Sequence, residues 1–369
     1  MSTPEVGKLP ATDPESEAAT SASDPGPSRT RRALAFVDRS NNLYIFLVLV
    51  GLVAFFSIIS PNHAFFDRGN FVNIAWDTAE MLLLAIGETF VIITAGIDLS
   101  VGTVLMLSGV VASWVIAQSG GPPAAVASGH FPNAATAIPL GIVAGLAVGT
   151  LGGALNGLLV TRLRMPAFIV TLGVFSIANG LGDLISSSGA AGQSAIPPIP
   201  PVFAATLGNG NLVFGFPTLV IVAAVVAVLA HLVLTRTVFG RRTFAVGSNL
   251  EGSRLAGVPV NSHVLWVYVF AGFMSGLAGI LDLARFHSTD IQGHGLDNLN
   301  AIAAVVIGGT SLFGGTGSIL GTVIGAFIPT VLRYGFTIQG ISSFWQDVVV
   351  GAIIIVAVLV DQIRRRRVT

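Results

Sequence analysis

The chain has 369 residues and no formal net charge; 53% of its residues are hydrophobic and only 10% are charged. An ordinary globular protein has about 25% charged residues, so the composition excludes a water-soluble domain and predicts an all-α polytopic membrane protein. The absence of cysteine excludes disulfides, thiolate metal sites and cysteine nucleophiles. Zero net charge gives no indication of a nucleic-acid partner.

Residues 1–40 are rich in Pro, Ser, Thr and acidic groups and poor in large apolar ones, which predicts a disordered cytoplasmic tail. This tail holds Lys8, the only lysine of the chain. A phosphate-binding P-loop needs a lysine within a glycine-rich loop, and no such loop surrounds Lys8. Any ATP-driven work must therefore come from a partner, and the chain is predicted not to be an enzyme.

Ten apolar runs follow the tail, and each is long enough to suggest a helix that enters the membrane. They define a transmembrane domain over residues 41–363, with a basic cytoplasmic tail at 364–369. An even number of spans places both termini on one side of the membrane. The expected spans are 43–60, 72–94, 99–117, 138–160, 166–187, 217–235, 263–283, 299–313, 318–334 and 344–361.

Basic residues indicate the orientation of these spans. With the N-terminus inside, 15 of the 18 basic residues fall in inner segments, and the exceptions are Arg68, Arg285 and Arg333. Cytoplasmic loops accumulate Lys and Arg, so both termini and the loop 236–262 are predicted to be cytoplasmic. The loops 118–137 and 188–216 then lie outside, as turn-rich spacers or as a docking surface for an external partner.

The first interrupted stretch, residues 88–102, places polar groups between two apolar halves. Glu88, Gly96, Asp98 and Ser100 are the candidates for lining a substrate path, since ionisable residues at membrane depth are functional candidates by default. Asp98 and Ser100 also precede an apolar run, so they suit the cap of a helix as well as a path. The two roles are compatible.

The second interrupted stretch, residues 303–318, is rich in glycine and contains Gly308, Gly309, Thr310 and Ser311. Small residues at this density permit non-helical backbone where the chain lines a cavity, or close contact between helices. Glycine packing and a role in the pathway are both open readings of the sequence.

The cytoplasmic stretch 239–258 predicts a short helix capped by Asn249 and ended by Gly257. Glu251 and Arg254 lie within that helix. A small helix in a cytoplasmic loop suits docking into a groove of a soluble partner, and a simple interfacial helix fits the pattern equally well.

The six histidines do not recur at metal-ligand spacing, apart from the loop pair His287 and His294. Serines lack a consistent arrangement of His and Asp partners. The sequence therefore predicts neither a metal site, nor a cofactor, nor a catalytic residue.

Four segments resemble the permease subunit of bacterial ABC importers for monosaccharides, the ribose, xylose, arabinose and galactose group. They are GETFVIITAGIDLSVGTVLMLSG (87–109), NGLLVTRLRMPAFIVTLG (156–173), RRTFAVGSNLEGSRLAGV (241–258) and AIAAVVIGGTSLFGGTGSILGTVIGAF (301–327), and SSFWQ (342–346) follows the last of them. Together with the layout of the spans, the resemblance covers most of residues 43–367.

The resemblance implies a membrane protein of the bacterial inner membrane that pairs with a second permease copy. It also implies two ATPase domains below the membrane, an extracytoplasmic sugar-binding protein above it, and alternating access driven by ATP. Carried over to this sequence, transmission from the ATPase falls on Gly247, Asn249, Glu251, Arg254 and Gly257. The 96–100 and 308–317 segments are implied to shape the pathway.

Two segments depart from the pattern of the family, at three positions. Asn298 and Asn300 stand where an acidic pair is common, and Asn179, within the fifth span, stands where an arginine is common. Both changes remove charge near the outer half of the pathway. A neutral ligand remains compatible with the sequence, and Asn179 joins the candidate pathway residues.

Two classes of function follow. The preferred one is the permease subunit of an ABC importer for a monosaccharide. Within that class, nucleosides, polyols and branched-chain amino acids are alternative substrates. The rival class is a secondary transporter driven by an ion gradient, which the broken spans and the intramembrane residues Asp98 and Glu88 also suit.

Overall fold

The computed structural model describes residues 29–187, 199–208, 210–213, 216–289, 293–342 and 344–366. The chain forms two compact units, Met1–Asn41 and Asn42–Thr369. Of the tail predicted to be disordered over residues 1–40, residues 1–28 lie outside the described residues, whereas residues 29–40 form the first part of helix α1 (Arg29–Ile59). The part of the predicted outer loop at 188–198 and the last residues of the basic tail, 367–369, also lie outside the described residues.

Long helices account for most of the described chain, and every apolar run expected from the sequence coincides with one of them. They are α1 (Arg29–Ile59), α2 (Arg68–Ile93), α3 (Val101–Ser119), α5 (Ala134–Arg162), α6 (Ala167–Ser187), α8 (Thr218–Arg236), α11 (Val260–Phe286), α12 (Asp297–Ile307), α13 (Ile319–Ile338) and α14 (Phe344–Arg366).

Short elements connect these helices. They are η1 (Pro61–Phe66), α4 (Pro123–Ala127), α7 (Pro201–Phe203), η2 (Ala204–Gly208), α9 (Val238–Ser248), α10 (Leu250–Leu255) and η3 (Gly293–Leu296). Strands β1 (Asn211–Val213) and β2 (Phe216–Pro217) form a small antiparallel pair. The predicted helical class therefore holds, apart from this pair in the connector before α8.

Seven helices among the described residues are long and apolar enough to cross a membrane, namely α1 from Asn42 onwards, α3, α5, α6, α8, α11 and α13. The expectation of ten spans is not confirmed by this measure. Helix α2 has the length but carries Asp77, Glu80 and Glu88. Helix α12 has 11 residues, about 16 Å at 1.5 Å per residue, which is half of a hydrocarbon core about 30 Å thick.

Helix α11 forms the centre of the unit and packs against α2, α3 and α5. Its contact with α5 depends on glycines that recur every fourth residue along α5, among them Gly145, Gly149 and Gly153. A Cβ built on Gly149 would lie 2.5 Å from the Cα of Gly276 on α11. Because only hydrogen fits there, the two backbones approach as small residues allow within membranes.

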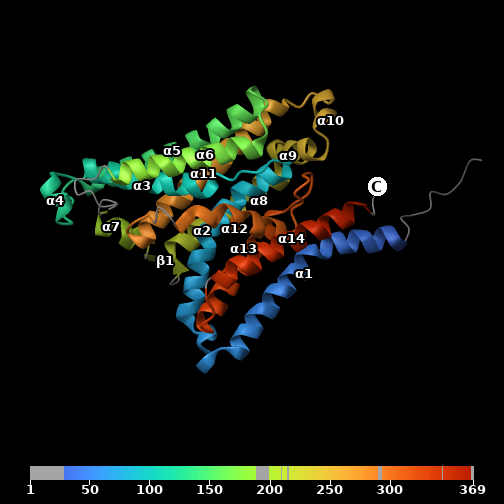
Figure 1. The fold of residues 1–369 in the computed structure, drawn as a ribbon, viewed down its shortest axis with the longest axis horizontal. Coiled ribbons are helices and arrows are strands. Elements are labelled where there is room, and N and C mark those ends of the chain that lie inside the picture. Colours follow the sequence, from blue (N-terminus) through green and yellow to red (C-terminus); the bar gives the residue numbers. More distant parts are fainter. Residues whose placement is uncertain are drawn as a thin grey trace, which may run out of the picture. The chain divides into compact units, whose positions relative to one another are not determined.

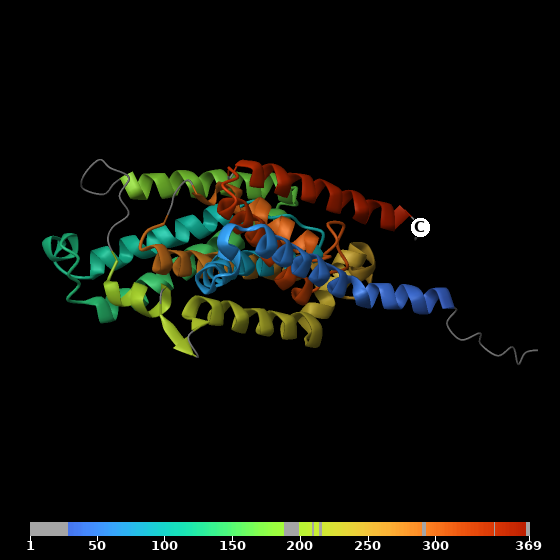
Figure 2. The same cartoon turned by 90° about the horizontal axis from the view of Figure 1, so that it is seen from below.

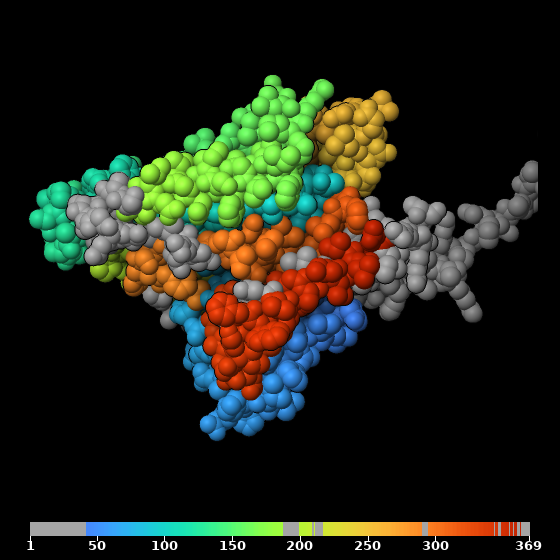
Figure 3. Space-filling view, in the orientation of Figure 1, coloured from blue at the N-terminus to red at the C-terminus, as the bar shows by residue number. Residues whose placement is uncertain are grey.

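The connecting elements gather at two ends of the bundle. Figure 1 places α4 and α7 at one end and α9 and α10 at the other, and the turned view in Figure 2 agrees. Figure 2 also shows α6 and α14 on one side of the bundle and α8 on the opposite side. In the space-filling view, α6 forms an uncovered band (Figure 3), with Phe168, Ile177 and Leu184 each more than half exposed.

Candidate functional site

The polypeptide leaves helical geometry between α2 and α3, as the first polar interruption predicts. Helix α2 ends at Ile93, and Ala95 has a left-handed backbone with φ of 61°. The Gly96 amide donates back to the carbonyl of Val91 over 3.0 Å. A Cβ on Gly96 would lie 2.8 Å from the hydroxyl oxygen of Tyr268 on α11, so glycine lets this turn press against α11.

Asp98 is buried at the end of this turn and is held by three donors. Its Oδ1 accepts hydrogen bonds from the Ser100 amide at 2.8 Å and the Ser100 hydroxyl at 2.6 Å. The Asn156 amide on α5 donates to Oδ2 at 3.2 Å and to the Ser100 hydroxyl oxygen at 2.8 Å. Ser100 occupies the cap position of α3 without a side-chain cap bond, so Asp98 fixes the turn that leads into α3 and does not cap its first turn directly.

Two further polar groups lie beside the Asp98 turn and make no hydrogen bond of ordinary geometry among the described residues, although Glu88 lies close to the Asp98 backbone. Both carboxyl oxygens of Glu88 are fully buried, and so is the hydroxyl of Tyr268. Asp98 interacts electrostatically with each of them. Buried polar groups without partners are costly, and in native proteins they are rare enough to require an explanation.

The sequence left two interpretations open for the glycine-rich loop between α12 and α13, helix packing and non-helical backbone, and the structure contains both. Gly308 is a packing glycine, because a Cβ there would lie 2.6 Å from the backbone of Gly321 on α13. Gly314 and Gly315 instead have positive φ, 83° and 78°, a region that glycine adopts without steric cost. Thr310 and Ser311 are buried within the same loop, and Gly309 also has a positive φ, 86°.

Three distant segments meet at one point, which we call the junction: the end of α2 at Ile93, the end of α9 at Gly247, and the loop at Gly314 and Gly315. The Gly315 amide donates to the Ile93 carbonyl at 2.9 Å. A Cβ on Gly247 would collide with that same carbonyl and lie 2.7 Å from the Gly315 nitrogen. The junction therefore joins the predicted coupling loop to both interrupted stretches.

Helix α10 beyond the junction forms as the sequence predicts. The Asn249 side chain accepts from the Gly252 amide at 2.7 Å, and Gly257 ends the helix with φ of 80°. Glu251 and Arg254 form an exposed ion pair of 3.2 Å across one turn. Leu255 is 85% exposed beside them, so α10 presents one apolar side chain and two charges outward.

Asn179 stands apart from the other predicted pathway residues. It is half-buried on α6, a helix that packs against α3 and α5. No hydrogen bond within the described ranges joins it to the Asp98 turn. Sequence reasoning instead missed Asn156 and Tyr268, although a lone polar residue within an apolar span is itself a signal of function.

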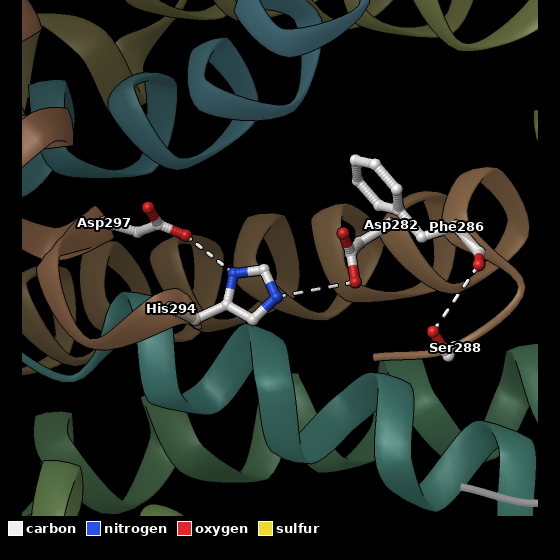
Figure 4. A network of polar contacts seen from close by, with 5 residues as sticks. All are labelled: Asp282, Phe286, Ser288, His294 and Asp297. Carbon is white, nitrogen blue, oxygen red and sulfur yellow. Dashed lines mark hydrogen bonds and ion pairs between the residues drawn. The ribbon is translucent and has the colours of Figure 1, made fainter. Parts of the chain in front are cut away.

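A second group of charges lies near the other end of α2 and α11. Asp77 pairs with Arg285 and accepts from the Tyr334 hydroxyl at 2.9 Å. His294 of η3 lies between Asp297, 2.7 Å from Nδ1, and Asp282, 3.5 Å from Nε2 (Figure 4).

Burial lowers the pKa of His294, but its ion pairs with Asp282 and Asp297 and its hydrogen bond with Asp297 outweigh this and raise the pKa to about 11. Glu80, His294 and Asp297 have potential ligand atoms within 4.8 Å of one another. Because a metal requires a neutral imidazole, a protonated His294 is an ion-pair partner and a poor ligand.

Interrupted helices, buried polar groups beside the interruptions and an exposed helix joined to them define a membrane permease. The chain belongs to the family described as branched-chain amino acid transport system, permease component, whose pattern matches residues 70–358.

Similar curated proteins include a probable ABC transporter permease of Sinorhizobium fredii, 36% identical over 93% of this chain and 95% of that protein. The ribose import permease of Escherichia coli is 38% identical over 89% of this chain and 94% of its own length. The fructose import permease of Rhizobium meliloti is 36% identical over 86% and 84% respectively. No solved structure matches the chain.

Proposed function

We propose that the chain is the membrane-spanning permease subunit of an ABC importer and forms the translocation pathway for a monosaccharide. The observation that carries this proposal is the junction, where the Gly315 amide binds the Ile93 carbonyl against Gly247. A force applied to α9 and α10 reaches the ends of α2 and of the glycine-rich loop through backbone contacts alone. A separate ATPase subunit that moves α9 and α10 would need such a connection to change the pathway.

In this proposal, a separate ATPase subunit docks on α10 and drives the movement. Its contact residues are Asn249, Glu251, Arg254 and the exposed Leu255, while Gly247 and Gly257 set the position of the helix. This docking helix is short, capped at both ends and exposed, which suits insertion into a groove. The chain itself supplies no nucleotide-binding loop, so it acts as a transport subunit and not as an enzyme.

The orientation proposed from the arginines is cytoplasmic for α9, α10 and both termini, in a bacterial inner membrane. Ten helices then enter the membrane, with α12 reaching only partway. An extracytoplasmic sugar-binding protein delivers the solute at the end marked by α4 and α7. A second copy of the permease completes the pathway, and the uncovered apolar band of α6 is available to lipid or to that copy.

Alternating access is the mechanism that the interruptions support. Glu88, Asp98, Ser100 and the loop residues Thr310 and Ser311 lie on polypeptide that is not held by continuous helix, or directly beside it. When the junction moves, the turn at Gly96 and the loop beginning at Gly308 and Gly309 move with it. The oxygens of Glu88 are then available to hydrogen-bond a passing hydroxyl group.

A monosaccharide is the proposed solute because relatives similar over most of the chain are ribose and fructose import permeases. Branched-chain amino acids are the alternative that the description of the family suggests, and polyols and nucleosides are the alternatives that the sequence leaves open.

The test is uptake of radiolabelled pentoses, hexoses and leucine into proteoliposomes that contain the permease, its ATPase and its binding protein. We expect ATP-dependent uptake of one sugar, unaffected by collapse of proton and sodium gradients. Uptake that persists with an inactivated ATPase would instead identify a gradient-driven transporter.

A further inference from the structure

A polar cavity lies between α2, α11, α12 and α13, away from the junction. Its volume is about 460 Å³, and six of the residues that line it are charged or titratable: Asp77, Glu80, Asp282, His294, Asp297 and Arg333. Small-molecule sites commonly have volumes of about 300–1,000 Å³. The cavity is therefore large enough for a small solute and is lined by many hydrogen-bonding groups.

Charges around the cavity nearly balance one another. Four acidic side chains, Asp77, Glu80, Asp282 and Asp297, line the cavity together with Arg333 and His294, and Arg285, outside the lining, pairs with Asp77. A phosphate-bearing solute would meet an excess of carboxylates, while a neutral solute meets alternating donors and acceptors. Neutral ligands rich in hydroxyl groups match such a wall, because each hydroxyl both donates and accepts.

Several buried polar atoms at this cavity have no hydrogen-bond partner among the described residues. Asp282 is 2% exposed and His294 8%, and Asp282 Oδ2 and His294 Nε2 face each other only at 3.5 Å. Both residues line the cavity. Arg285 Nη1 beside them is likewise unpartnered. Buried donors and acceptors of this kind are costly unless a ligand or water completes their bonds.

Aromatic side chains lie in or next to the cavity wall, beside the charged residues. Phe286 lines the cavity, and the guanidinium of Arg285 lies over its ring at 4.5 Å and over the ring of Trp76 at 5.5 Å. Figure 4 shows Phe286 one turn from Asp282 on α11, beside the ion pairs of His294. Charged hydrogen-bonding groups next to an aromatic ring form the mixed wall that fixes the orientation of a small ligand.

The position of the cavity matches a site at membrane depth. Glu80 lies 13 residues before the end of α2 at Ile93, about 20 Å along the helix axis. Asp77, Leu84 and Glu88 recur at intervals of seven and four residues and so share one face of α2. The cavity reaches Leu84, and Leu84 is itself buried, so this side chain lies between the cavity and Glu88 along that face of α2.

The first interrupted stretch also meets the start of α12 beside the cavity. A Cβ on Gly102, in the first turn of α3, would lie 2.6 Å from the His294 carbonyl and 3.2 Å from the Asp297 Cβ. The Asn298 side chain at the start of α12 donates to the Leu99 carbonyl at 3.0 Å. Helices α3 and α12 therefore both begin here, as the broken helices of transporters do around a substrate site.

We propose that this cavity is a binding site for the transported monosaccharide within the permease itself, with Glu80, Asp282 and His294 as its specificity-determining residues. The proposal rests on the proposed function. Carboxylate oxygens of Glu80 and Asp282 accept hydrogen bonds from sugar hydroxyls, and the imidazolium of His294 orients both Asp282 and Asp297. Leu84 then closes the way to Glu88 and Asp98 until the junction moves.

The test compares uptake of the transported sugar with uptake of its monodeoxy analogues, using Asp282→Asn and Glu80→Gln. Each variant is reconstituted with the same ATPase and binding protein, so discrimination by the binding protein cancels in the comparison. Hydrogen bonds to charged groups contribute about 1.5–3 kcal/mol. We expect kcat/KM for the parent sugar to fall roughly tenfold to hundredfold, with little further loss for the analogue that lacks the hydroxyl bound by the altered residue.

Asp183→Asn is the matched control, because Asp183 is an exposed carboxylate on α6 that does not line the cavity. Equal losses for the sugar and every analogue would show a structural role and overturn the proposal, as would unchanged uptake. Failure of the wild type to import any monosaccharide would refute the proposed function, and this inference with it.

Discussion

Gly247→Ala inserts one methyl group where three backbone segments already touch. The new Cβ would collide with the Ile93 carbonyl and lie 2.7 Å from the Gly315 nitrogen. Both neighbours are backbone atoms, so neither can rotate away. Overpacking of this kind costs about 1–3 kcal/mol, and it also threatens the 2.9 Å hydrogen bond between Gly315 and Ile93.

The added methyl group destabilises the junction, whereas the exposed face of α10 is unchanged. We therefore expect the ATPase to remain bound, while sugar transported per ATP hydrolysed falls about fivefold to hundredfold, the equivalent of 1–3 kcal/mol. Uptake and hydrolysis are measured in the same proteoliposomes, and association is measured by pull-down of the ATPase.

Gly51→Ala is the control for this change, because no atom lies within 4 Å of the added Cβ and alanine favours helix. It should transport as the wild type does. A Gly247→Ala permease with the wild-type ratio of transport to hydrolysis would refute the role given to the junction, and so would a variant that loses the ATPase altogether.

Three further predictions concern docking, packing and pH. Asn249→Ala removes the cap of α10 at a cost of about 1 kcal/mol and should weaken pull-down of the ATPase severalfold, whereas Asn249→Asp, which can still cap, should not. Gly149→Val places side-chain atoms against the backbone of Gly276 and should lower the melting temperature in detergent by several degrees, while Gly173→Ala, which has open space around it, should leave it unchanged. His294 has its pKa raised from 6.5 to about 11, so the folded state binds this proton more tightly; its contribution to stability is complete below about pH 6.5 and is lost as the pH rises towards 11. The fall of melting temperature between pH 7 and 10 should be smaller in His294→Gln, and identical slopes would contradict the ion pairs assigned to His294.

Local signals in the sequence predict local structure well here. Asn249 and Gly257 delimit α10 because capping is decided within one turn of a helix. The interruption at Gly96 and Asp98 follows for the same reason. Hydropathy likewise locates every long helix, since lipid leaves few alternatives for an apolar run. It overestimates α12, which ends at Ile307 because the chain turns into the glycine-rich loop.

Contacts between distant segments could not be predicted in this way. Nothing in the spacing of Asn156 or Tyr268 indicates that they meet the Asp98 turn, because those contacts depend on how α5 and α11 cross. Glycines at every fourth position of α5 did carry a signal for that crossing, the pattern of small residues at helix interfaces.

The number of charged side chains around the cavity is the clearest difference between expectation and structure. The sequence suggests a pathway depleted of charge, since Asn298 and Asn300 replace acidic residues. Folding brings Glu80, Asp282 and Asp297 together from three separate segments around one cavity. Two of the three arginines that break the positive-inside pattern lie at this cavity. Arg333 lines it, and Arg285 pairs with the lining residue Asp77.

The central claim is that ATP hydrolysis by a partner drives a monosaccharide through this chain. The most direct measurement is sugar uptake by proteoliposomes that contain the permease, its binding protein and either an active or a hydrolysis-deficient ATPase. We expect uptake of one pentose or hexose with the active ATPase and none with the deficient one. Equal uptake in the two preparations would contradict it.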